Sequence, residues 1–255
     1  MVMKIGIVIV ATRGYFLLGL RFMKKFMHWY QGKEPIEFHF FSDRNVKEYV
    51  SDSFPVVFHN HYTKDWVAGT NSKFDCILSL EKSDCDYLFY FDADTNIGKK
   101  FTEEWFLGDL VGGQHWGDLA FMKEKPFDRN PRSKAFVPKT THLPQMYYYG
   151  AFFGGKKHLL MELMRTLKRY QQKDREIGYE PVWNDESYLN KEFHFRPPAR
   201  TVLSKEFAFL ISDKGGLENT RGMEENTAEH LAFAKENKDK VLEIAYGNVF
   251  IAPNT

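Results

Sequence analysis

Cysteine is scarce in this chain of 255 residues, which contains only Cys76 and Cys85. Two cysteines cannot build a disulfide framework, and their scarcity points to a reducing compartment. Long apolar runs are missing too. The apolar run at 4–11 is too short to cross a bilayer, so we expect no transmembrane segment. We expect this run to form the first strand of a sheet, and a cleaved signal peptide is the alternative.

An excess of charge of one sign is also missing. Lys and Arg number 35 against 34 Asp and Glu, a net charge of +1, which predicts no nucleic-acid partner and no binding to an acidic membrane. Aromatic residues are abundant at 16%, with 24 Phe and 13 Tyr. Such residues suit clefts for sugars and bases, but a Phe-rich core is the commoner explanation. The composition is that of a globular protein with one large domain or two small ones.

Apolar strands alternate with helical patterns in the first part of the chain. This alternation predicts βαβ units and an α/β fold with a Rossmann-like, mainly parallel sheet flanked by helices. Further on, we expect a short helix capped by Gly112 and Gly113, and an aromatic strand that ends at Gly154 and Gly155. The expected strands lie at 4–11, 37–41, 55–59, 87–91, 147–153 and 201–207, and the expected helices at 15–30, 73–81, 101–110, 156–173, from about 185, and 224–236.

Two carboxylates, Asp92 and Asp94, directly follow the expected strand 87–91. Residues i and i+2 of an extended chain point the same way, and ligands of open α/β sheets lie beyond the carboxyl ends of strands. Paired carboxylates repel each other, and a hard divalent cation relieves that repulsion. The spacing favours a metal–diphosphate site, although an Asp after a strand is also an ordinary turn or cap residue.

Two further stretches stand out. Residues 183–191 read Trp-Asn-Asp-Glu-Ser-Tyr-Leu-Asn-Lys, and adjacent acids at a helix start are usually capping residues. Residues 147–155 read Tyr-Tyr-Tyr-Gly-Ala-Phe-Phe-Gly-Gly. Glycines in an aromatic strand either admit a ligand close to the backbone or simply bend a core strand.

In their order and spacing, the three stretches resemble glycosyltransferase family 6, the family of the histo-blood-group A and B transferases, over about residues 4–207. The resemblance implies a GT-A type fold and a retaining hexosyltransferase. Such an enzyme would move galactose or N-acetylgalactosamine from a UDP-sugar to a galactose-containing oligosaccharide or glycolipid in α1,3 linkage. It also implies Mn²⁺, with Mg²⁺ as the alternative, held by Asp92 and Asp94.

The resemblance assigns a role to each matching residue. Glu186 would face the anomeric carbon, as nucleophile or as stabiliser of an oxocarbenium-like state. Ala151 favours galactose, because it leaves less room for an acetamido group than glycine does. The nucleotide would contact Val10, Thr12, Tyr15 and Lys73; the donor sugar would contact Tyr149, Gly150, Ala151 and Asp185; and the acceptor would contact His115 and Trp183.

The chain departs from the family pattern at several places. Lys73 stands where the family has an arginine, so the charge is kept but the bidentate fork is lost. Asn184 replaces a usual histidine, and residues 116–118 also differ, which puts the acceptor in doubt. No N-terminal anchor like that of Golgi-resident members is seen, so we expect a cytoplasmic enzyme of a bacterium or a virus-infected bacterial cell.

The expected organisation is a single catalytic domain at 1–211. Its nucleotide-binding part would span about 1–98, and its acceptor- and sugar-binding part about 99–211. Residues 212–255 would be a C-terminal extension that could act as a lid.

Two other functions remain open. Residues 91–95 also resemble the nucleophile motif of haloacid dehalogenase-type phosphatases. That class needs a second acidic motif, but Gly117-Asp118 is followed by Met122 where an Asp is required, and residues 183–191 stay unexplained. The third alternative is a non-catalytic sugar-binding module.

Overall fold

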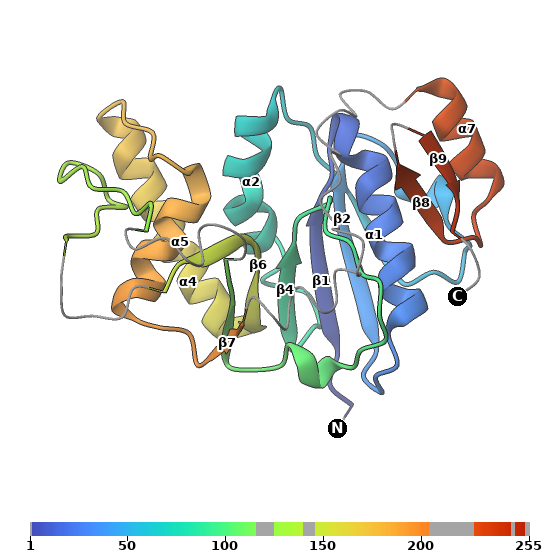
Figure 1. Ribbon diagram of the computed structural model, residues 1–255, viewed down its shortest axis with the longest axis horizontal. Helices are drawn as coiled ribbons and strands as arrows, with labels where there is room; N and C mark the ends of the chain where they lie inside the picture. Colours follow the sequence, from blue (N-terminus) through green and yellow to red (C-terminus); the bar gives the residue numbers. More distant parts are fainter. Residues whose placement is uncertain (1, 116–124, 140–145, 204–226, 246–247, 253–255) are drawn as a thin grey trace.

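A seven-stranded sheet forms the centre of the computed structural model (Figure 1), with the strand order β3-β2-β1-β4-β6-β5-β7. The structure describes residues 2–115, 125–139, 146–203, 227–245 and 248–252. β1, β2, β3 and β4 run parallel, β6 is antiparallel to both β4 and β5, and β7 is parallel to β5. The strands are β1 (Ile5–Val10), β2 (Ile36–Ser42), β3 (Val56–Asn60), β4 (Tyr87–Phe91), β5 (Leu110–Gln114), β6 (Tyr148–Lys156) and β7 (Arg200–Val202).

Helices cover both faces of the sheet, which explains why its central strands are apolar without alternation. Along β1, Ile7 and Ile9 pack into the core with α1 (Phe16–Trp29), whereas Val8 packs into the core on the other face. That second core also receives α2 (Trp66–Leu78), α4 (Lys157–Glu176) and α5 (Asn184–Phe195). The predicted α/β fold with a mainly parallel sheet is confirmed.

The predicted helix at 101–110 is wrong. Only a 3-10 turn, Glu103–Trp105, forms there, and the two glycines expected to cap a helix lie inside β5. A Cβ on Gly112 would come within 2.8 Å of both Phe193 and Tyr148. Glycine is therefore required here by crowding, not by a helix end.

Two predicted boundaries also differ from the structure. β6 continues through both of its last glycines to Lys156, and a Cβ on Gly154 would lie 2.4 Å from the carbonyl oxygen of Leu88. α2 begins at Trp66 rather than at 73, because the side chain of Asp65 accepts from the backbone N–H of Ala68 (2.7 Å) and caps the helix start.

The C-terminal segment packs beside α1 (Figure 1). It consists of α7 (Ala228–Glu236) and a hairpin of β8 (Leu242–Ala245) and β9 (Asn248–Ile251). Leu242 and Ile244 join the same core cluster as β1. The predicted domain border at 211 lies outside the described residues, so the border and the lid role stay predictions. Among the helices that the structure describes, none is long and apolar enough to cross a bilayer.

Candidate active site

The carboxyl ends of β1 and β4 lie side by side, because these parallel strands pair with Val8 opposite Tyr90. Asp92 and Asp94 follow β4 and therefore lie at the carboxyl ends of the parallel strands, where Val10 ends β1. The Tyr90 hydroxyl donates to Asp92 Oδ1 (2.7 Å), and the backbone N–H of Asp92 donates to the carbonyl of Ala151 (3.0 Å). Asp92 is thus fixed against both β4 and β6.

Three of the predicted nucleotide-binding residues lie at or just beyond the carboxyl end of β1. Thr12 follows β1 and shares a hydrogen bond with Thr63 through the two hydroxyls (2.6 Å). Tyr15 ends the 3-10 turn that follows and packs against the core around α1. Val10, Thr12 and Tyr15 therefore lie on the strand end and turn next to the aspartates.

One cation ties three distant segments together. Lys73 projects from α2, and its Nζ lies 3.1 Å from Asp92 Oδ1, 3.0 Å from Asp185 Oδ2 and 3.4 Å from the carbonyl oxygen of Gly150. Burial disfavours the charge on Lys73, but Asp185 and Asp92 more than offset it and hold the pKa well above its usual value. Lys73 is therefore a permanent cation that brings α2, β4, β6 and α5 to one point.

Glu186 meets the backbone of β6. Its Oε2 accepts a hydrogen bond from the N–H of Gly150 (2.7 Å), and a Cβ at Gly150 would lie 3.0 Å from the Glu186 Cβ. Burial raises the pKa of Glu186 to about 7; the Gly150 N–H opposes this shift, and Asp185 adds to it. Near neutral pH this carboxyl group divides between its acid and its ionised form.

Two further carboxyl groups are also shifted toward neutrality. Burial raises the pKa of Asp185 to about 6 against the opposing charge of Lys73. Burial, followed by the charge of Asp92, raises the pKa of Asp94 to about 6. The charge of Asp92 thus contributes to the raised pKa of Asp94, and the two carboxyl groups offer oxygen ligands, which fits a hard divalent ion such as Mn²⁺ or Mg²⁺.

Aromatic residues flank these acids. The ring of His115 lies 4.8 Å from that of Tyr149, nearly perpendicular to it at 77°. Burial, and then the charges of Asp92 and Asp94, raise the pKa of Tyr149. Trp183 immediately precedes α5 and remains 47% exposed. The structure thus places Tyr149 close to Asp92 and Asp94, and His115 against Tyr149.

Sequence reasoning missed a clamp between β6 and α5. The Asn190 side chain accepts from the backbone N–H of Tyr148 (2.7 Å) and donates to its carbonyl oxygen (2.8 Å) and to that of Glu186 (3.0 Å). This amide sets the distance between Glu186 and Gly150. The spacing of the two residues could have predicted this contact, because Asn190 is four residues after Glu186 and so lies on the same face of the helix.

Residues 3–214 match glycosyltransferase family 6, which is most of the chain. The chain belongs to this family. The family 6 assignment agrees with the fold, because a mostly parallel seven-stranded sheet with helices on both faces is the predicted GT-A type architecture. The bacterial or viral origin stays a prediction.

Curated relatives point the same way. The chain is 33% identical over 125 residues to Histo-blood group ABO system transferase 1 of Rattus norvegicus, which covers 49% of this chain and 35% of the relative. It is 30% identical over 156 residues to Globoside alpha-1,3-N-acetylgalactosaminyltransferase 1 of Homo sapiens (61% and 44%). The Gallus gallus protein of the same name is 26% identical over 216 residues (80% and 61%). The chain thus spans less than two thirds of each of these relatives.

Proposed function

We propose that this chain is a retaining α1,3-glycosyltransferase that moves galactose or N-acetylgalactosamine from a UDP-sugar to a galactose-containing oligosaccharide or glycolipid. The observation that carries the proposal is the Lys73 bridge, which joins Asp92 of the metal pair to Asp185 beside Glu186. A nucleotide diphosphate and its sugar would need these two groups of acids side by side. Membership in family 6 and the α1,3 linkage in the names of relatives support the same reaction.

In this proposal Asp92 and Asp94 hold Mn²⁺, with Mg²⁺ as the alternative. When bound, the ion acts as a Lewis acid that offsets charge on the departing UDP. Val10, Thr12 and Tyr15 contact the base and ribose. These residues meet where the neighbouring strands β1 and β4 end, as ligand sites of open α/β sheets do.

Glu186 faces the anomeric carbon. Its ionised form acts either as a nucleophile or as the anion that stabilises positive charge developing on the sugar ring. The Gly150 N–H holds one carboxylate oxygen, which fixes the orientation of the group. Lys73 and Asp185 bind the diphosphate side and the sugar hydroxyls, respectively.

Donor and acceptor choice rest on neighbouring residues. Tyr149, Gly150 and Ala151 lie against the sugar, and the methyl group of Ala151 favours galactose over N-acetylgalactosamine. His115 and Trp183 contact the acceptor. The cytoplasmic location expected from the sequence stays a prediction.

The direct test is a screen of UDP-galactose and UDP-N-acetylgalactosamine against lactose and fucosyl-lactose, with Mn²⁺ or with a chelator. We expect galactose transfer with retention, lost on chelation. Turnover of p-nitrophenyl phosphate with Mg²⁺ but no transfer would favour the phosphatase. UDP-sugar binding with neither transfer nor hydrolysis would favour the sugar-binding module.

A second test isolates the metal pair. Asp92→Ala or Asp94→Ala should remove the Mn²⁺-dependent part of UDP binding measured by calorimetry. Unchanged affinity for UDP in the presence of Mn²⁺ would contradict the assignment.

A further inference from the structure

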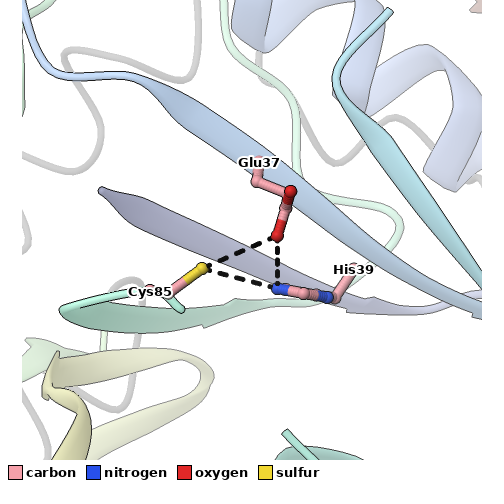
Figure 2. A group of neighbouring side chains, drawn as sticks. All are labelled: Glu37, His39 and Cys85. Carbon is pink, nitrogen blue, oxygen red and sulfur yellow. Dashed lines mark hydrogen bonds and ion pairs between the residues drawn. The ribbon is translucent and has the colours of Figure 1, made fainter. Parts of the chain in front are cut away.

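A second group of possible metal ligands lies away from the acids described above. Glu37 and His39 of β2 and Cys85, which precedes β4, converge so that their ligand atoms all lie within 4.8 Å of one another (Figure 2). His39 and Cys85 are buried, and Glu37 is half-buried. We name Glu37, His39 and Cys85 the triad.

The triad meets across a strand that lacks a side chain at this point. β1 runs between β2 and β4, and its Gly6 pairs with Glu37 on one side and Leu88 on the other. A Cβ at Gly6 would lie 3.0 Å from Cys85 Sγ and 3.2 Å from His39 Cδ2. Glycine at this position leaves the space in which the triad comes together.

The separations within the triad match those of a tetrahedral ion. Zinc binds nitrogen and oxygen at about 2.0–2.1 Å and sulfur at about 2.3 Å, so tetrahedral ligands lie about 3.3 Å (N···O) and about 3.6 Å (S···N and S···O) apart. In the triad, His39 Nε2 lies 3.4 Å from Glu37 Oε1 and 3.6 Å from Cys85 Sγ, and Sγ lies 3.8 Å from Glu37 Oε1.

We propose that the triad supplies three ligands to a Zn²⁺ ion that ties β2 to the start of β4 across β1, with water as the fourth ligand. Sulfur and imidazole nitrogen suit Zn²⁺, whereas Mn²⁺ and Mg²⁺ prefer oxygen ligands. The two sites are also at opposite ends of the sheet, since the rise from Gly6 to Val10 along β1 is about 13 Å. On binding, the Cys85 S–H bond breaks, its proton passes to water, and the thiolate sulfur bonds to the ion.

Neighbouring residues hold the ligands in place. His39 Nδ1 lies 3.2 Å from His59 Nε2, and Lys4 Nζ lies 2.8 Å from Glu37 Oε2, the oxygen that the triad does not use. His39 Nε2 faces the other two ligand atoms of the triad. The Lys4 charge opposes a cation, but it is shared with Asp84 (2.7 Å).

The test uses the intact, metal-free chain titrated with Co²⁺ and then with Zn²⁺. We expect a sulfur-to-cobalt charge-transfer band with the intensity of one Co²⁺–thiolate bond per chain, which Zn²⁺ then removes; Co²⁺ at Asp92 and Asp94 cannot produce this band because these residues offer no sulfur. Cys85→Ser should lose it. Cys76→Ser, which changes the other buried cysteine, is the matched control and should keep it. Zn²⁺ should raise the melting temperature of the wild type and of Cys76→Ser but not of Cys85→Ser.

Graded variants keep the proposal testable if Cys85→Ser does not fold. Glu37→Gln, at a half-buried position, should weaken Zn²⁺ binding strongly. His59→Ala should weaken it roughly 10–100-fold, the usual effect of losing the hydrogen-bond partner of a metal ligand. No band in the wild type, or a band that survives in Cys85→Ser, would overturn the proposal and would mark the triad as a hydrogen-bonded cluster only. None of these readouts involves sugar transfer, so they stand apart from the proposed activity.

Discussion

At the scale of single residues, Gly150 leaves little room beside Glu186 in the candidate site. Gly150→Ala would place a Cβ 3.0 Å from the Glu186 Cβ and 3.1 Å from its Oε2, so the carboxylate must move. We expect a large loss of kcat and a loss of about 1–3 kcal/mol in the free energy of unfolding. Urea unfolding and initial-rate kinetics measure both.

Gly69→Ala is the matched control for this change. A Cβ at Gly69 would meet only Thr63 Oγ1 at 3.6 Å, an ordinary contact, and Gly69 lies within α2. Alanine is a better helix former, so this variant should be as stable as the wild type or more so. Equal losses in the two variants would contradict the role of the close approach.

Glu186→Gln should lower transfer by orders of magnitude while leaving the fold intact. It should also change the pH dependence of stability. Burial raises the pKa of Glu186 to about 7 in the folded chain, against about 4.3 when unfolded, so the wild type loses stability as the pH rises through this window. Gln removes the penalty, which is on the order of 3–4 kcal/mol. The melting temperature should therefore rise at pH 8 and change little at pH 4.

The same shift gives a kinetic signature. Since the proposed role requires the ionised form, kcat/KM of the wild type should rise with pH through about 7. Near-normal transfer by Glu186→Gln would refute the role of this carboxylate, whatever its effect on stability.

At the scale of elements, the clamp between β6 and α5 depends on one amide. Asn190→Ala leaves the buried N–H and C=O of Tyr148 without their side-chain partner, which should cost about 2–4 kcal/mol of stability. Because Asn190 contacts no proposed substrate group, UDP affinity should stay close to wild type while kcat falls. If UDP affinity fell in parallel with kcat, the clamp would not act on Glu186 specifically.

The elements also show what a sequence can predict. β1, β2, β3 and β4 were expected to within one or two residues, because continuous β-prone apolar runs have few other uses. Glycine misled at Gly112, because the sequence does not say whether a glycine ends a helix or makes room for a neighbouring ring. The position of Asp92 and Asp94 was predicted correctly because it depends only on a local feature, the end of the apolar run that forms β4.

The rest of the site depends on contacts distant in sequence. Lys73 meets Asp185 across 112 positions of the chain, a contact made by the packing of α2 on α5. The family resemblance placed Lys73 near the donor, but its salt bridges to two acids were not foreseen. The Asn190 clamp also joins residues that are distant in sequence, Tyr148 and Asn190. It was missed because a polar residue in a helix usually faces solvent.

At the scale of the whole molecule, the C-terminal hairpin is linked through α1 to the loop that carries Asp92 and Asp94. Glu243 of β8 pairs with Arg21 (4.0 Å) and with Lys25. Arg21 donates to the carbonyl oxygen of Asp94 (3.2 Å), and Lys25 donates to Asn96 Oδ1 (2.9 Å). Two buried cations therefore connect the end of the chain to the loop that carries the aspartates.

Glu243→Gln should leave these cations without their counter-charge. Because 24% of the Glu243 side chain is exposed, we expect a loss of about 1–3 kcal/mol, below the roughly 3–5 kcal/mol of a fully buried pair. Calorimetry should also show weaker UDP binding in Mn²⁺. Glu48→Gln is the control: it breaks the exposed pair with Lys235 (2.8 Å) and should change neither quantity measurably.

The hairpin has a practical consequence for anyone who shortens this protein. The match to the family ends at residue 214, yet Leu242 and Ile244 fill the same core as β1 and α1. A chain cut at 214 would expose the apolar side chains of α1 that Leu242 and Ile244 cover. It would also leave Arg21 and Lys25 without the carboxylate of Glu243. In size-exclusion chromatography, the fragment that ends at 214 should elute as aggregates. A chain that continues to residue 252, and so keeps α7 and the hairpin, should elute without aggregates.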